Sequence, residues 1–230
     1  MKYKAIFFDR DGTLTHGNPE KRAWLAERAS AWSGRPYLAS AEKSQTIFNQ
    51  ASLNEEAVDS LEAEKRFWLR YYEALLRMEG VKIKVEARAR ELMDGLWCSN
   101  SSIAYDDVIE TLGYFKSRGY KMGVISDTFP SLRLTIEDAG LGAYFQSYTS
   151  SSLVGVMKPD PAIYQAALDS LGVDAEESIY VDDYDVESDG ARNMGFLSFH
   201  IVRNGDLKAP WDIASLVDIV AHVENAEPGM

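Results

Sequence analysis

Cysteine, histidine and long apolar runs are all scarce in this chain of 230 residues. The single cysteine, Cys98, excludes a disulfide framework and a zinc site built from several thiolates. The histidines at positions 16, 200 and 222 show no metal-ligand spacing, so we expect them on the surface or in packing contacts. No stretch has the length of a membrane span, and the first apolar run is too short for a signal peptide. We therefore expect a cytoplasmic protein with no membrane partner.

Positive charge is also in short supply. The chain has 24 lysines and arginines against 36 aspartates and glutamates, which gives a formal net charge of -12. Because a nucleic acid is bound mainly through its phosphates, a chain without a basic footprint is not expected to have a nucleic-acid partner. An enzyme of this charge that handles phosphate needs local cations or a metal ion in its site.

A pair of carboxylates follows the first apolar segment, residues 5–8, which has the character of a short buried strand. Side chains two positions apart on an extended segment point the same way, so Asp9 and Asp11 are expected to face one site. Gly12 then permits a sharp turn. An ordinary acidic turn has the same composition. Like charges held this close need a cation or a shared proton, and open α/β sheets bind ligands at such strand ends.

The rest of the chain changes character twice. Residues 19–93 have helical spacing, including a capping-box pattern at 52–55 that predicts the start of a long helix ending at Gly80. From residue 101 onward, helices alternate with short apolar strands, a pattern typical of a mostly parallel sheet. The first strand is needed to complete that sheet. We therefore predict an α/β protein with a Rossmann-like core domain (1–18 and 98–230) and an inserted, all-helical cap domain (19–97).

Three further polar signals occupy equivalent positions, at a strand end or a helix start. Ser126 follows the apolar residues 123–125, Lys158 precedes a helix predicted over 159–171, and Asp182 and Asp183 follow the apolar residues 179–181. Each alone has a bland explanation, as a turn, a solvated lysine or an acidic surface loop. Their order along the chain, with Asp9 in front, is hard to obtain by chance.

In this order, the four segments resemble the four motifs of the haloacid dehalogenase-like (HAD) hydrolase superfamily. The segments are Phe8-Asp9-Arg10-Asp11-Gly12-Thr13-Leu14-Thr15, Ile125-Ser126-Asp127, Met157-Lys158-Pro159 and Val181-Asp182-Asp183. The helical block lies where the phosphoglycolate phosphatase and β-phosphoglucomutase branch carries its cap. Asp182 departs from the pattern, because glycine is usual there. The second acidic residue of the fourth motif is open between Glu187 and Asp189, and Asp182, Glu187 or Asp189 could join Asp183 at a metal.

The resemblance implies that Asp9 is the nucleophile and forms an aspartyl-phosphate. It implies a Mg²⁺ ion bound by Asp9, the Asp11 carbonyl and Asp183. Asp11 is then the general acid that protonates the leaving oxygen and later activates water. In the family, an aspartate at this second position separates phosphotransfer enzymes from dehalogenases.

The same resemblance assigns the contacts with the substrate. Lys158 and Ser126 are expected to hold the phosphoryl oxygens, and Lys158 also restrains the nucleophile. We expect Arg10 and Asp127, which adjoin these motifs, to bind substrate as well. One helical segment of the cap carries several residues that could contact a phosphorylated sugar or acid: Arg66, Trp68, Arg70, Tyr71 and Tyr72. Helix packing explains Trp68 and Tyr72 at least as well.

The predicted function is thus a Mg²⁺-dependent phosphatase acting on a small phosphorylated metabolite. A sugar phosphomutase is the nearest alternative, but it needs a cap acid/base for which the chain has no patterned source. A phosphonate hydrolase needs a cap lysine as Schiff-base nucleophile, and no cap lysine has a distinguishing context. A non-enzymatic phospho-accepting switch also combines aspartates, a hydroxyl and a lysine. It does not explain a helical insertion directly after the first acidic pair.

Overall fold

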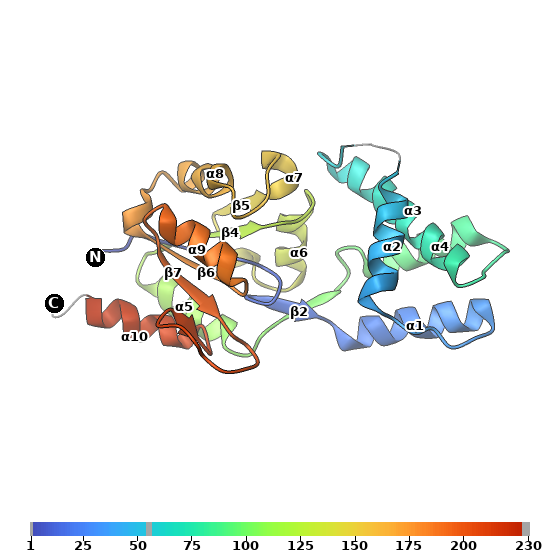
Figure 1. Cartoon of the computed structure of the whole chain (residues 1–230), viewed down its shortest axis with the longest axis horizontal. Coiled ribbons are helices and arrows are strands. Elements are labelled where there is room, and N and C mark those ends of the chain that lie inside the picture. Colours follow the sequence, from blue (N-terminus) through green and yellow to red (C-terminus); the bar gives the residue numbers. More distant parts are fainter. Residues whose placement is uncertain (1, 54–56, 227–230) are drawn as a thin grey trace. The chain divides into compact units, whose positions relative to one another are not determined.

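The computed structural model describes residues 2–53 and 57–226. Two compact units make up the chain. One contains the residues up to His16 together with those from Ser102 onward, and the other is Gly17–Ser101. The first unit is α/β and the second is helical (Figure 1). Among the described residues, no helix has both the length and the apolar character that crossing a membrane requires.

The α/β unit is built on a six-stranded sheet in the order β5-β4-β1-β6-β7-β8. From one edge to the other its strands are Ser147–Ser150, Lys121–Ser126, Ala5–Phe8, Ser178–Asp182, Leu197–Ile201 and Asp212–Ile213. Every neighbouring pair is parallel. Strand β1 lies inside the sheet, with Phe8 opposite Val124 of β4 and Val181 of β6. The predicted α/β, Rossmann-like fold is confirmed.

Strand β1 is apolar throughout because both faces of the sheet are covered by helices. Its side chains alternate, so that Ile6 and Phe8 join one core and Ala5 and Phe7 join the other. The first core also receives side chains from α5 (Val108–Ser117), α6 (Leu132–Asp138) and α10 (Val217–Ala226). The second receives them from α8 (Pro161–Leu171) and α9 (Asp185–Asn193). The strand that carries Asp9 is therefore fixed from both sides.

Short elements complete this unit. Strands β2 (Thr15–Gly17) and β3 (Ser102–Ala104) pair in a separate two-stranded sheet where the chain leaves for the helical unit and returns. Helix α7 (Ser151–Val154) follows β5, and two single turns of 3-10 helix lie at Gly142–Tyr144 and Ala175–Glu177.

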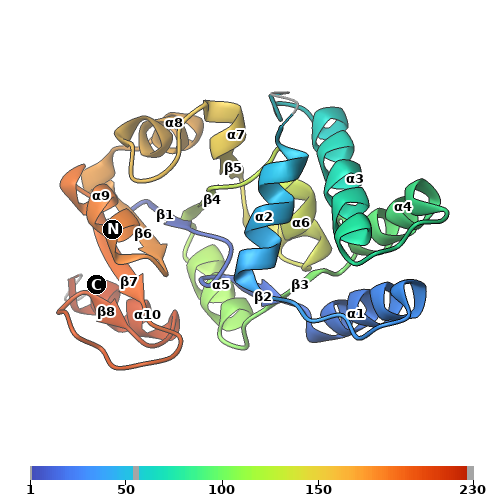
Figure 2. The same ribbon diagram turned by 45° about the vertical axis from the view of Figure 1, so that its right-hand side comes forward.

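The helical unit, whose helices are labelled in Figure 2, has its own apolar core. Its helices are α1 (Pro19–Ser33), α2 (Ala41–Ala51), α3 (Leu61–Met78) and α4 (Val85–Leu96). Each contributes buried side chains, such as Ala29, Ile47, Leu75 and Leu92. Helix α1 has the expected signals at both ends, because the Asn18 side chain accepts from a first-turn amide and the left-handed Gly34 ends the helix.

Two helix starts lie five or more residues away from the sequence-based expectation. The long helix α3 begins at Leu61, where the Ser60 hydroxyl accepts from Ala63 N–H. It does not begin at the capping-box pattern of 52–55, of which residues 54 and 55 lie outside the described residues. The sequence predicts a short helix over 190–194, but helix α9 begins five positions earlier, at Asp185, because the acidic residues after β6 form its first turn. Negative side chains are favoured at a helix N-terminus. This earlier start places Glu187 on a helix.

Candidate active site

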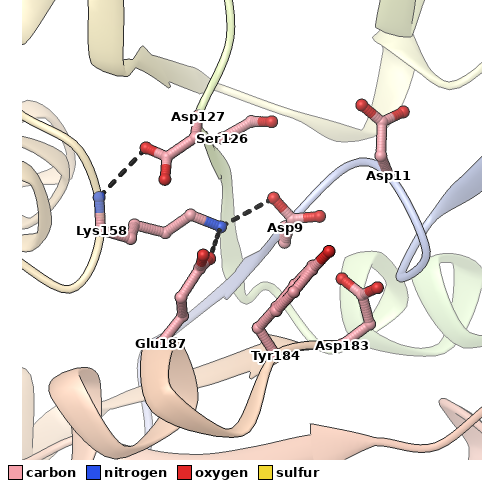
Figure 3. Close-up of a pocket in the computed structure, with 8 residues that line it drawn as sticks. All are labelled: Asp9, Asp11, Ser126, Asp127, Lys158, Asp183, Tyr184 and Glu187. Carbon is pink, nitrogen blue, oxygen red and sulfur yellow. Dashed lines mark hydrogen bonds and ion pairs between the residues drawn. The ribbon is translucent and has the colours of Figure 1, made fainter. Parts of the chain in front are cut away.

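The carboxyl ends of three neighbouring strands meet at one polar pocket. Asp9 directly follows β1, Ser126 ends β4 and Asp182 ends β6. Because β1 pairs in parallel with both neighbours, these strand ends share one edge of the sheet. The pocket at this edge is lined by Asp9, Asp11, Ser126, Asp127, Lys158, Asp183, Tyr184 and Glu187 (Figure 3).

The turn that follows β1 is tightly wound and lies against Asp183. The backbone amides of Leu14 and Thr15 both donate to the Arg10 carbonyl, at 2.9 and 2.8 Å. Gly12 has a φ of +80°, and a Cβ atom there would lie 2.1 Å from Oδ2 of Asp183. A side chain at this position would meet both backbone strain and a clash. Glycine therefore lets the turn close against Asp183.

Lys158 joins three carboxylates that come from different parts of the chain. Its Nζ lies 2.8 Å from Oδ1 of Asp9, 2.7 Å from Oδ2 of Asp182 and 2.6 Å from Oε2 of Glu187. The lysine side chain is only 2% exposed, and its backbone N–H donates to Asp127. Burial opposes the charge, but the surrounding groups raise the pKa of Lys158 well above its usual range. The ammonium group is therefore a permanent cation beside Asp9.

The carboxylates around this lysine outnumber the positive charges that face them. Burial raises the pKa of Asp9 to about 7 against the opposing effect of Lys158, and Asp182 raises it further. Burial, followed by the charges of Asp9 and Asp182, raises the pKa of Asp183 to about 7. Burial also raises the pKa of Asp182. A single ammonium group does not balance these carboxylates, so the site favours either a proton or a second cation.

The same carboxylates fit a hard divalent cation. Asp9, Asp182 and Asp183 each offer an oxygen, and these oxygens all lie within 4.8 Å of one another. In the part of the chain that the structure describes, Oδ1 of Asp183 is buried without a hydrogen-bond partner. A buried carboxylate oxygen without a donor is costly, and Mg²⁺ takes such oxygens as ligands. The residues present therefore suit Mg²⁺, and Asp182 belongs to the cluster together with the predicted ligands Asp9 and Asp183.

The remaining predicted residues of the first motif lie at the side of the pocket. The carboxylate of Asp11 points away from Asp9 (Figure 3) and is 2.6 Å from Nη2 of Arg10. The same guanidinium group donates to the hydroxyl groups of Thr128 and Thr135, both at 3.0 Å. The Arg10 side chain thus links the turn after β1 to the loop after β4 and to helix α6. The predicted contact between Arg10 and substrate stays a prediction.

The structure also decides which acidic residues of the fourth motif reach the site. Glu187, on the first turn of α9, contacts Lys158, whereas Asp189 pairs with Arg192 and its side chain is 64% exposed. The sequence pattern that pointed to Glu187 was its four-residue spacing from Asp183.

No sequence pattern predicted a role for two tyrosines in this region. Tyr184 lines the pocket, and the hydroxyl of the buried Tyr180 donates to Asp182.

Comparison with known proteins assigns the chain to a family. A model of the haloacid dehalogenase-like hydrolases matches residues 3–195. The chain belongs to this family. The hydrolase is 27% identical over 210 residues to Phosphatase MT3486 of Mycobacterium tuberculosis, which covers 90% of this chain and 91% of the relative. It is 31% identical over 129 residues to the (S)-2-haloacid dehalogenase of a Pseudomonas species, with coverage of 53% and 56%. The crystal structure of a HAD phosphatase from Thermococcus onnurineus superposes with a TM-score of 0.64 at 25% identity, covering 96% of this chain and 97% of the other.

Proposed function

We propose that this hydrolase is a Mg²⁺-dependent phosphatase that acts on a small phosphorylated metabolite through an aspartyl-phosphate. The observation that carries the proposal is the Asp9 carboxylate, which lines the pocket 2.8 Å from the Lys158 ammonium group, with a second aspartate two positions later. Within the family, an aspartate at the position of Asp11 is typical of phosphotransfer enzymes. The likeness to a phosphatase along 91% of that relative's length also supports the proposal.

In the first half of the reaction, a carboxylate oxygen of Asp9 attacks the phosphorus atom. The bond between phosphorus and the leaving oxygen breaks, and that oxygen takes a proton from the Asp11 carboxyl group. To reach it, Asp11 exchanges its contact with Arg10 for the leaving oxygen. Lys158 and the Ser126 hydroxyl donate to the phosphoryl oxygens as negative charge builds up on them.

In the second half, water attacks the phosphorus atom of the aspartyl-phosphate. Asp11, now a carboxylate, accepts the proton of this water, and the bond between phosphorus and the Asp9 oxygen breaks. Inorganic phosphate leaves, and both aspartates return to their initial states. Asp9 and Asp183, with Asp182 beside them, would hold Mg²⁺, which supplies positive charge that lets the anionic nucleophile and the anionic phosphoryl group approach each other.

The direct test is hydrolysis of p-nitrophenyl phosphate by the purified chain, with Mg²⁺ and with EDTA. We expect turnover only with the metal. The Asp9→Asn variant, which keeps the shape but loses the nucleophile, should lose at least ~10³ in kcat. Full activity in EDTA, or activity near wild type in Asp9→Asn, contradicts the mechanism.

The same preparation distinguishes the other functions. Chloride release from a 2-chloro acid without phosphatase activity would make the chain a dehalogenase. Stable phosphorylation without release of phosphate would make it a switch, and phosphoryl transfer within a sugar phosphate would make it a mutase. A panel of phosphorylated sugars and acids, compared by kcat/KM, then identifies the substrate class.

A further inference from the structure

The Lys158 ammonium group has three carboxylate partners in this structure, two through hydrogen bonds and the last through an ion pair. They are Asp9, Asp182 and Glu187, at 2.8, 2.7 and 2.6 Å. An ammonium group has no fourth donor. The proposed function requires Lys158 to donate to a phosphoryl oxygen. One of these carboxylates then has to lose its contact with the lysine.

Asp182 has replacements for that lost contact. Its side chain is fully buried, and its Oδ2 accepts from the Tyr180 hydroxyl as well as from Lys158. Its Oδ1 accepts from the backbone N–H of Tyr184 at 2.9 Å. Both oxygens therefore keep a donor when Lys158 turns away. Since a buried carboxylate without a donor is strongly penalised, this arrangement makes Asp182 the partner that can release the lysine.

Tyr180 is suited to this role by its surroundings. The residue is on β6 and is completely buried, with its ring packed edge-on against Tyr164 at a centroid distance of 5.5 Å. An ionised carboxylate can only accept, so the Tyr180 hydroxyl is the donor in its contact with Asp182. The hydroxyl touches a carboxylate that is itself not the nucleophile. The centroid of the Tyr180 ring also lies 6.0 Å from Lys158 Nζ, a contact that Tyr180→Phe keeps, so the effect of the hydroxyl itself passes through Asp182.

We propose that Tyr180 is a positioning residue of the phosphatase site, whose hydroxyl holds Asp182 in place and frees one N–H of Lys158 for the phosphoryl group. This inference rests on the proposed function for the identity of the reacting group. Without the hydroxyl, Asp182 depends on Lys158 for its remaining donor at Oδ2. The lysine is then held back from both the phosphoryl group and Asp9.

The test is the Tyr180→Phe variant, which removes only the hydroxyl. We expect kcat/KM for p-nitrophenyl phosphate to fall about tenfold, the effect of losing one hydrogen bond to a charged group. Tyr164→Phe is the matched control, because Tyr164 is a buried tyrosine of the same cluster whose hydroxyl donates to the backbone carbonyl of Glu187 at 2.7 Å. It should lose a similar amount of thermal stability and keep kcat/KM within about twofold.

A double-mutant cycle separates positioning from a general structural effect. In an Asp182→Asn background, adding Tyr180→Phe should lower kcat/KM by no more than about twofold, because the carboxylate through which the hydroxyl acts is already absent. Losses that multiply, a Tyr180→Phe variant as active as wild type, or an equal loss in Tyr164→Phe would each overturn the inference.

A crystal structure of Tyr180→Phe gives a readout that does not depend on activity. The contact between Lys158 Nζ and Asp9 Oδ1, 2.8 Å in the wild-type chain, should be lost or lengthened, whereas Tyr164→Phe should retain it. An unchanged lysine in Tyr180→Phe contradicts the positioning role even if the wild-type chain hydrolyses no phosphate ester. A wild-type chain without phosphatase activity, combined with a displaced lysine, would instead contradict the proposed function alone.

Discussion

Asp11 lies with its carboxylate toward Arg10 and away from Asp9, and its side chain is 60% exposed. This position is compatible with the proposed general acid, which moves during turnover, and it lies outside the cluster of carboxylates formed by Asp9, Asp182 and Asp183. Its contribution should therefore be to proton transfer.

Asp11→Asn should lower turnover of alkyl phosphates by ~10² to 10⁴, the usual effect of losing a general acid or base. The loss should be smaller for p-nitrophenyl phosphate, whose leaving group departs without a proton. Because water attack is still slowed, phospho-enzyme should accumulate, which rapid-quench labelling detects. Mg²⁺ affinity, measured by calorimetry, should stay near that of wild type. Equal losses for good and poor leaving groups, with no trapped intermediate, would show that the proton comes from another group.

The raised carboxyl pKa values predict how stability depends on pH when the metal has been removed. Asp9 and Asp183 titrate near 7 in the folded chain and near 3.8 when unfolded, so the folded state binds protons more tightly. Their contribution to stability is present below pH 4 and is lost as the pH rises toward 7. Thermal unfolding in EDTA should show this decline, and Asp183→Asn should reduce it.

A Mg²⁺ ion bound at these aspartates, as proposed, would compete with these protons, so its stabilising effect should increase with pH. At a free concentration of 100 Kd, the ion should contribute roughly 2–3 kcal/mol to the free energy of unfolding. At equal Mg²⁺ concentration, the rise in Tm should be larger at pH 8 than at pH 5. A rise that is the same at both pH values would mean that Mg²⁺ does not bind at these aspartates.

At the scale of single elements, the turn after β1 depends on Gly12. A Cβ atom there would lie 2.1 Å from Oδ2 of Asp183, and the φ of +80° is itself unfavourable for other residues. Gly12→Ala should therefore displace Asp183 and lower the free energy of unfolding by roughly 1–3 kcal/mol. Mg²⁺ affinity should fall with it.

Gly140 provides the matched control for this turn. Its φ is +77°, but a Cβ atom there meets nothing within 4 Å. Gly140→Ala should show the cost of backbone strain without any change in Mg²⁺ affinity. The argument about Asp183 fails if both variants bind Mg²⁺ equally well by calorimetry.

At the scale of the whole molecule, the two-domain division is a prediction that deletion can test. Strands β2 and β3 pair where the chain passes between the two units, so Gly17 and Ser102 can be joined by a short linker in place of the residues between them. The α/β unit keeps both of its cores, and we expect it to unfold cooperatively. It should retain activity toward p-nitrophenyl phosphate and lose discrimination among metabolites.

Thermal unfolding and kcat/KM across the phosphate panel measure these two expectations separately. The Asp9→Asn form of the shortened chain controls for contaminating phosphatases. A shortened chain without a cooperative transition would show that the helical unit is required for folding. Unchanged ratios of kcat/KM would show that recognition lies in the α/β unit.

Local patterns in the sequence predicted the parallel sheet and most of the pocket. Apolar runs of strand length alternate with helices, and each ends in a polar residue. A parallel sheet brings such ends to one edge, so Asp9, Ser126 and Asp183 could be grouped without knowing the strand order. The edge strands β5 and β8 and the early start of α9 were not predicted, because their short or polar segments have weak intrinsic preferences and depend on tertiary neighbours.

Only the tertiary structure decided which side chains are partners. The sequence left Glu187 and Asp189 as alternatives, and the geometry of α9 directs the first to Lys158 and leaves the second to Arg192. The sequence did not indicate that the Arg10 guanidinium group donates to the Asp11 carboxylate, or that the Tyr180 hydroxyl donates to Asp182. The composition and order of residues set which strands and turns form, because those preferences are local. The assignment of each buried donor to an acceptor is made between distant parts of the chain, where burial makes every unpaired charge costly.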